Sequence, residues 1–213
     1  MHTLTTSDKA RGPLAPARRV GLKPAIFIAL LRGINVSGKN VIKMNTLREC
    51  FAQLGFISIR TYIQSGNVVF DKAHASVTGL RKTIEQAILS EFGFAVPIVL
   101  RTSKRVTEIV KGNPFLKQPT IDTSKLHITF LSDHPPQNAL ALLQPLAGTS
   151  EQLSIIGREI YLYCPAGYGN TKLSNAAIEK KLSIVATTRN WKTVNTLLDM
   201  AQCKNARPNG DCA

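Results

Sequence analysis

The chain has 213 residues, of which 27 are Lys or Arg and 13 are Asp or Glu, giving a formal net charge of +14. This length allows one large domain or two small ones, and the apolar fraction of 44% is that of a folded protein. No apolar run approaches the roughly 20 residues of a membrane-spanning helix, so we expect no membrane partner. The charge favours polyanions or phosphorylated ligands, although selection for solubility would explain it as well.

Residues 1–25 carry five basic side chains and one acidic side chain, and they lack the continuous apolar segment of a secretory signal. We expect a disordered basic arm here, with a targeting segment as the alternative. The four cysteines form no CxxC pair, and no histidine lies beside them at metal-ligand spacing. This pattern favours reduced thiols in the cytoplasm, with a pairing of Cys203 and Cys212 near the tail as the alternative.

The first half begins with a short apolar run, residues 26–31, which Arg32-Gly33 closes and which predicts a buried strand. Apolar residues three and four apart then predict helices over 44–54 and 77–92. Strand patterns cover 56–62, 68–70 and 96–100, and a short helix ends at Lys111. The order βαββαβ is typical of a ferredoxin-like unit, an antiparallel sheet with two helices on one face. We assign this unit to residues 26–111.

The second half follows a predicted linker, residues 112–124, which begins at Gly112-Asn113-Pro114. Strands are expected over 125–131, 152–156 and 159–163, and a helix is expected between Pro135 and Gly148. Two more helices are expected over 175–182 and 191–203. The order βαββαα over residues 125–203 indicates a second, loosely duplicated ferredoxin-like unit whose final strand is replaced, followed by a tail over 204–213. The whole chain is thus predicted to be an α+β protein.

Three polar segments lie at strand ends or helix starts: RGINVSGKN (32–40), QSGN (64–67), and KLSN (172–175) with TTRNW (187–191). If these segments converge, glycine backbone N–H groups, asparagine amides and cationic side chains would together bind an anion. The candidate ligand-binding residues are Arg32, Asn35, Gly38, Asn40, Lys43, Gln64, Ser65, Gly66, Asn67, Lys172, Arg189 and Asn190.

Ordinary turn chemistry is the alternative, and it is the favoured interpretation for residues 64–67, which have the composition of a hairpin turn. Residues 32–40 are longer than a turn requires, which favours a ligand. Gly33, Gly38 and Lys39 have the spacing of a phosphate-binding P-loop, but Asn40 replaces its Ser or Thr, so we do not assign one. The sequence shows no Ser-His-Asp set, carboxylate pair or metal-ligand group, so catalytic residues stay unassigned and neither metal nor cofactor is expected.

The segments ALLRGINVSGKN (29–40), TYIQSGNVVF (61–70) and TTRNWKTVNTLL (187–198) resemble the bacterial domain of unknown function 1697 family. The resemblance covers residues 26–200 and implies an α+β protein of two ferredoxin-like units. It singles out the candidate residues above together with Gly33 and Trp191, and it supplies no biochemical activity. Members of the family typically begin close to the first strand, so the basic arm is a departure from the family pattern.

Three functions fit these observations. The first is a binding module for nucleic acid or a nucleotide, which the net charge and the basic, amide-rich loops favour. The second is an enzyme on a small phosphorylated or carboxylated substrate, held by Arg32, Lys43 and Lys172 and oriented by Gln64 and Asn67. The third is a protein-interaction scaffold without a small ligand.

Overall fold

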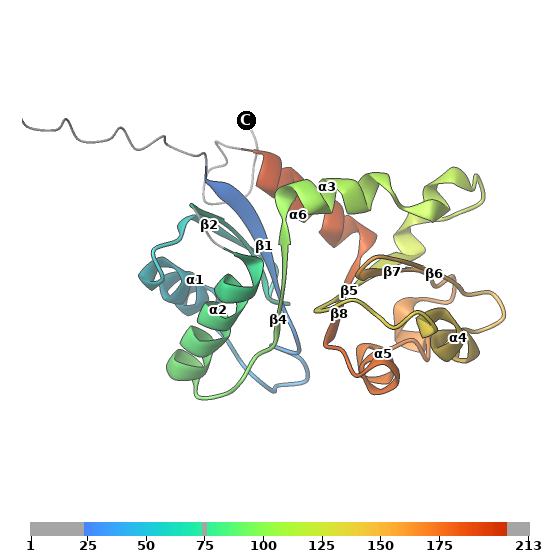
Figure 1. Cartoon of the computed structure of the whole chain (residues 1–213), viewed down its shortest axis with the longest axis horizontal. Coiled ribbons are helices and arrows are strands. Elements are labelled where there is room, and N and C mark those ends of the chain that lie inside the picture. The colour runs from blue at the N-terminus through green and yellow to red at the C-terminus, as the bar shows by residue number, and fades with distance from the viewer. Residues whose placement is uncertain (1–23, 74–75, 204–213) are drawn as a thin grey trace, which may run out of the picture.

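The computed structural model describes residues 24–73 and 76–203 and contains two four-stranded antiparallel sheets with helices around them (Figure 1). The protein is therefore of mixed α+β class, as the sequence predicted. The tail over 204–213 and all but the last two residues of the arm over 1–25 lie outside the described residues.

The first sheet has the strand order β2-β3-β1-β4, and the second has the order β6-β7-β5-β8. The elements of the first half are β1 (Ala25–Leu31), α1 (Met44–Gln53), β2 (Ile57–Tyr62), β3 (Asn67–Lys72), α2 (Val77–Phe92), β4 (Ile98–Thr102) and α3 (Ser103–Lys111). Two short 3-10 helices, η1 (Pro114–Lys117) and η2 (Thr123–Lys125), lead to the second half. Its elements are β5 (Leu126–Leu131), α4 (Ala139–Leu143), η3 (Gln144–Leu146), β6 (Gln152–Ile156), β7 (Glu159–Tyr163), η4 (Tyr168–Asn170), α5 (Asn175–Leu182), β8 (Ala186–Asn190) and α6 (Trp191–Gln202).

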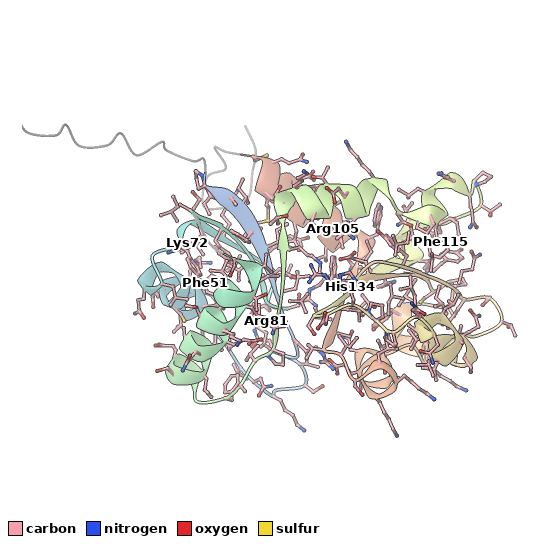
Figure 2. The ribbon with its side chains drawn as sticks, in the orientation of Figure 1. Phe51, Lys72, Arg81, Arg105, Phe115 and His134 are labelled. Atoms are coloured by element: carbon pink, nitrogen blue, oxygen red, sulfur yellow. The ribbon has the colours of Figure 1, made fainter. Side chains whose placement is uncertain are left out.

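Strand β1 is apolar on both faces because both faces are covered. Phe27 and Leu31 point into a core formed with α1 and α2, where Phe51 is fully buried (Figures 1 and 2). Ile28 and Leu30 point to the opposite face, where they join a second core shared with α3, α6 and the second sheet. The two halves are thus held together by a common hydrophobic core.

The stretch predicted as a linker, residues 112–124, contributes to this shared core through Phe115, which is 5% exposed. The helix expected between Pro135 and Gly148 is shorter than predicted, because only α4 and the 3-10 turn η3 form there. A third core lies between the second sheet and helices α4 and α5.

Strand β8 corrects the predicted order βαββαα of the second half. Residues 186–190 pair antiparallel with β5, from Leu131 with Ala186 to His127 with Asn190. The sequence Ala-Thr-Thr-Arg-Asn lacks an apolar alternation, so it carries no strand pattern. Its inward residues are Thr187 and Arg189, whose polar groups are satisfied by hydrogen bonds within the interior.

The two halves repeat the same order, β-α-β-β-α-β-α, and the same long-range backbone hydrogen bonds. In each half the last residue of the first strand, and the residue after it, donate to equivalent carbonyl groups. The N–H of Leu31 donates to the carbonyl of Gly66 at 2.8 Å, as Leu131 donates to Arg158 at 2.9 Å. The N–H of Arg32 donates to the carbonyl of Pro97, as Ser132 donates to Val185, both at 2.9 Å. The structure is therefore an internal duplication in which β4 corresponds to β8 and α3 to α6.

Arg101 on β4 forms the first of two equivalent arginine bridges between the halves. Its Nε donates to Oε1 of Glu159 at 2.7 Å, and its Nη2 donates to the carbonyl of Leu131 at 2.8 Å. Both side chains are almost completely buried, and Arg105 donates to the other Glu159 oxygen at 2.6 Å. Burial lowers the pKa of Arg101, and the Glu159 carboxylate opposes this shift.

Arg189 on β8 forms the second bridge without a carboxylate partner. Its Nε donates to Oδ1 of Asn67 at 2.6 Å, and its Nη2 donates to the carbonyls of Leu31 at 2.8 Å and Ser65 at 3.1 Å. The residue is 8% exposed, and burial lowers its pKa to about 10, so it stays protonated at neutral pH. Neutral amide and carbonyl oxygens therefore hold a buried positive charge between the halves.

Substituting Gly66 with Ala should destabilise the protein far more than the same change at Gly38. Both glycines have positive φ, +76° and +73°, which costs a side chain roughly 1–2 kcal/mol. A Cβ on Gly66 would also lie 2.7 Å from Cβ of Leu31 and 2.8 Å from Cδ1 of Ile34, whereas nothing lies within 4 Å at Gly38. We expect urea unfolding to show a loss of about 3 kcal/mol for Gly66→Ala and about 1 kcal/mol for Gly38→Ala. Equal losses would contradict the close packing of the hairpin against β1.

Replacing Arg189 with Lys should also destabilise the protein, because one ammonium group cannot reach the oxygens on both sides of the guanidinium. Each buried acceptor that loses its donor costs roughly 1–3 kcal/mol, so we expect a loss of at least about 2 kcal/mol. The control is Arg32→Lys, which changes a part-exposed ion pair and should cost less than about 1 kcal/mol. Chemical denaturation followed by circular dichroism measures both, and a smaller effect at Arg189 than at Arg32 would rule out the bridge.

Candidate functional site

The loop after β1 is a small hairpin of its own. The N–H of Asn35 donates to the carbonyl of Asn40 at 3.1 Å, and the N–H of Lys39 donates to the carbonyl of Val36 at 3.0 Å. Ser37 and Gly38, the two central residues, both have positive φ, as a type I′ turn requires. The loop therefore projects as a defined turn, and two of its backbone N–H groups are used internally.

The asparagine side chains of this loop hold it in place. The Asn35 amide nitrogen donates to the carbonyls of Ile42 at 3.0 Å and Gln64 at 2.8 Å, and its Oδ1 accepts the N–H of Ile42 at 2.8 Å. The Asn40 amide donates to the carbonyl of Gly33 at 3.1 Å. Because α1 begins only at Met44, the loop also lacks the helix start of a P-loop.

The QSGN segment belongs to the hairpin between β2 and β3. Asn67 is fully buried, and its amide donates to the carbonyl of Tyr62 at 3.1 Å and to Oγ of Ser65 at 3.0 Å, while its oxygen accepts from Arg189. Ile63 in the same turn has a φ of +49°, which is strained for a β-branched residue. The segment thus contributes Asn67, Ser65 and Gly66 to the bridge between the halves and leaves Gln64 exposed.

Arg32 is paired with an acid that the sequence reading missed. Its Nε and Nη2 donate to the two carboxylate oxygens of Glu179 on α5, at 3.1 and 3.0 Å. Glu179 also accepts the N–H of Ala186 at 2.9 Å. A separation of 147 residues hides this pair from sequence reasoning. The cationic group expected at the centre of the anion site is therefore already neutralised.

The remaining candidates do not join this group. Asn190 caps α6, since its Oδ1 accepts the N–H of Thr193 at 2.8 Å. Lys172 is exposed and lines a separate cavity beside Pro145 and Glu151. The structure thus brings Asn67, Ser65, Gly66 and Arg189 together in the interior, but not Lys172 or Asn190 with them. No interaction among the described residues joins Lys172 to Arg32 or Lys43, so the substrate cradle expected from these three side chains stays a prediction.

Two lysines and three aliphatic side chains remain exposed where the two loops meet. The ammonium groups of Lys39 and Lys43 have no partner among the described residues, and Gln64 beside them is exposed. Val36, Val41 and Ile63 are 58%, 62% and 51% exposed, which is unusual for their type. We call the five residues Val36, Lys39, Val41, Lys43 and Ile63 the loop tip. Of these five residues only Lys43 belongs to the site predicted from the sequence, and the loop tip is exposed and free to contact another molecule.

Nothing in residues 24–73 and 76–203 forms a metal site, since no group of three or more His, Cys, Asp or Glu side chains gathers there. The thiols of Cys50 and Cys164 are buried, and burial raises the pKa of Cys164 to about 11, so it is protonated at neutral pH. No helix in the same residues is long and apolar enough to span a bilayer.

The profile of a family described as "Protein of unknown function (DUF1697)" matches residues 25–161. A conserved bacterial protein from Streptococcus pneumoniae has a similar solved structure, with a TM-score of 0.67 and 21% sequence identity over 84% of this chain and 99% of that chain. At this identity the likeness shows the fold alone. No curated protein matches the sequence. Because the profile covers more than half of the chain, the protein belongs to the DUF1697 family.

Proposed function

We propose that the protein binds an anionic ligand of the nucleic acid or nucleotide class, most favourably a single strand, through the loop tip. The charge of the segment that forms the tip carries this proposal. Lys39 and Lys43 are exposed and meet no acidic side chain among the described residues, whereas Arg32 in the same loop is already paired with Glu179. A strand of phosphates near this surface would meet a one-sided positive field.

The chemistry of the loop tip fits a strand rather than a buried small molecule. Lys39 and Lys43 supply point charges for phosphates, and Val36, Val41 and Ile63 supply apolar contact for sugars or base faces. No aromatic side chain is among these five residues, so base stacking of the kind common in single-strand binders would be absent. We therefore expect affinity to come chiefly from phosphate contacts, with little sequence preference.

The internal hydrogen bonds of the two loops support this proposal because they fix the loop tip before a ligand arrives. Asn35 ties the loop after β1 to the carbonyl of Gln64, and Arg189 ties the Gln64 hairpin to the second half. A surface that is already ordered avoids the entropy cost of ordering on binding.

We also infer that each half is a ferredoxin-like unit, over residues 26–111 and 125–203. The strand orders β2-β3-β1-β4 and β6-β7-β5-β8, with every pairing antiparallel, support this inference.

The test is a double variant, Lys39→Gln with Lys43→Gln, compared with Lys180→Gln with Lys181→Gln at the end of α5. Both pairs are exposed, and both variants lose two positive charges. Fluorescence anisotropy with a labelled single-stranded oligonucleotide should show weaker binding for the loop-tip variant only. The slope of log affinity against log salt is negative and should become shallower by about 1.4 in the loop-tip variant, because each lost phosphate contact removes about 0.7 from its magnitude. Equal binding by the two variants, or no binding at low salt, would refute the proposal.

A further inference from the structure

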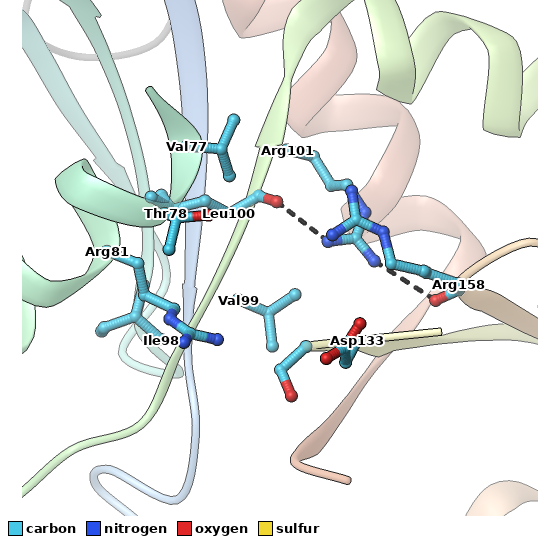
Figure 3. A pocket seen from close by; sticks show the side chains of 10 residues that line it. Val77, Thr78, Arg81, Ile98, Val99, Leu100, Arg101, Asp133 and Arg158 are labelled. Carbon is cyan, nitrogen blue, oxygen red and sulfur yellow. Dashed lines mark hydrogen bonds between the residues drawn. The ribbon is translucent and has the colours of Figure 1, made fainter. Parts of the chain in front are cut away.

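We propose a second ligand site, distinct from the loop tip, in a cavity of about 170 Å³ where the two halves meet (Figure 3). Its walls come from the first turn of α2, from β4, and from the turns that follow β5 and β6. The ligand class that fits is a small phosphate monoester that carries a hydroxyl or amino group. This inference does not depend on binding of nucleic acid at the loop tip.

Two arginines without partners reach this cavity from opposite sides. Nε of Arg81, on α2, is buried and has no hydrogen-bond partner among the described residues. The Arg158 guanidinium, from the turn between β6 and β7, likewise has no partner there. Figure 3 shows Arg81 on one side of the cavity and Arg158, next to Arg101, on the other. A buried guanidinium nitrogen without an acceptor is costly, and an anion in the cavity would supply that acceptor.

Arg101 closes the cavity from behind but is not available to a ligand. It donates to the carbonyls of Leu100 and Arg158, and it pairs with Glu159. This network fixes the backbone from which Arg158 projects, so the Arg158 guanidinium is held at the mouth of the cavity by rigid elements.

The internal duplication places Ser132 in the cavity wall at the position where the first half has Arg32. Ser132 corresponds to Arg32, since each donates its N–H to the equivalent carbonyl before the last strand of its half. On the first side, Arg32 reaches across the boundary between the halves and pairs with Glu179 of α5. On the second side the counterpart of Glu179 is Glu85 of α2, since Glu85 accepts the N–H of Ile98 as Glu179 accepts the N–H of Ala186. Ser132 therefore brings no cation to this wall, and Arg81 and Arg158 are the charged donors that reach the cavity without partners among the described residues.

The charges of the cavity define the ligand. Arg81 and Arg158 can bind a phosphate in a forked geometry, and α2, a helix of 16 residues, begins in the wall and adds its positive end. Asp133 at the rim is exposed, and its Oδ1 accepts the N–H of His134 at 2.7 Å. The other carboxylate oxygen of Asp133 would repel inorganic phosphate but would accept a hydrogen bond from a hydroxyl or amino group of the ligand. The volume admits a phosphate with a few carbon atoms, since a water in the liquid occupies roughly 30 Å³.

The experiment is a titration with inorganic phosphate and with glycerol 3-phosphate at constant ionic strength, followed by calorimetry. The full-length wild type should bind glycerol 3-phosphate saturably, with a millimolar or tighter dissociation constant, and should bind inorganic phosphate more weakly. Arg81→Gln and Arg158→Gln should each weaken binding at least tenfold. Asp133→Ala should remove the preference for glycerol 3-phosphate over inorganic phosphate.

The matched control is Lys82→Gln, which removes one charge from the neighbouring, exposed position of the same helix. This variant should bind like the wild type, as should the loop-tip double variant. If circular dichroism shows that Arg81→Gln is unfolded, Arg81→Lys replaces it in the test. This variant keeps the positive charge but cannot donate two parallel hydrogen bonds to the phosphate, so it should still weaken binding. Unsaturable binding, or equal weakening by Lys82→Gln, would overturn the proposal. Loss of oligonucleotide binding alone would not, because that experiment uses separate side chains.

Discussion

Arg101 and Arg189 each leave an edge strand of one sheet and hydrogen-bond carbonyl groups in the other half of the molecule. Both guanidinium groups are buried, so every donor needs an acceptor, and in each bridge one acceptor is the carbonyl at the end of the first strand of the opposite half. This requirement fixes the two sheets relative to each other more sharply than the shared hydrophobic core could, because hydrogen bonds are directional and apolar contact is not. The loops that carry the candidate sites are positioned by these bridges.

The duplication gives the two bridges different chemistry. Glu159 compensates the charge of Arg101, whereas Asn67 offers Arg189 only a neutral oxygen. A further difference lies one position further along the first strands, where Arg32 pairs with Glu179 but its counterpart is the uncharged Ser132. In a duplicated fold a new function can arise at such differences, because the backbone stays the same in both halves while one half loses a side-chain contact that the other keeps. The loop tip and the arginine cavity both lie at positions where the halves no longer match.

Much of the candidate site predicted from the sequence is structural. Asn35, Asn40 and Asn67 carry the motifs that drew attention, and each uses its amide to hold a turn or to bind Arg189. The asparagine amides and the neighbouring turn glycines correctly indicated an ordered loop. The sequence could not show whether the amides hydrogen-bond to a ligand or to other groups of the protein. Arg81 and Arg158, which line the cavity, lie in an ordinary amphipathic helix and an ordinary hairpin turn, so no local pattern marks them.

The sequence by itself determined the α+β class, the helices over 77–92 and 175–182, and the hairpin strands over 152–156 and 159–163, because apolar periodicity and turn residues are local properties. Only the tertiary structure decided that residues 186–190 form a strand, since the buried residues Thr187 and Arg189 are polar, and Arg189 is satisfied by partners in the first half of the chain. It also decided which cations are free: Arg32 meets Glu179 across 147 residues, while Lys39 and Arg81 meet no acid among the described residues. Pairing of charges depends on distance in space, which sequence order does not encode.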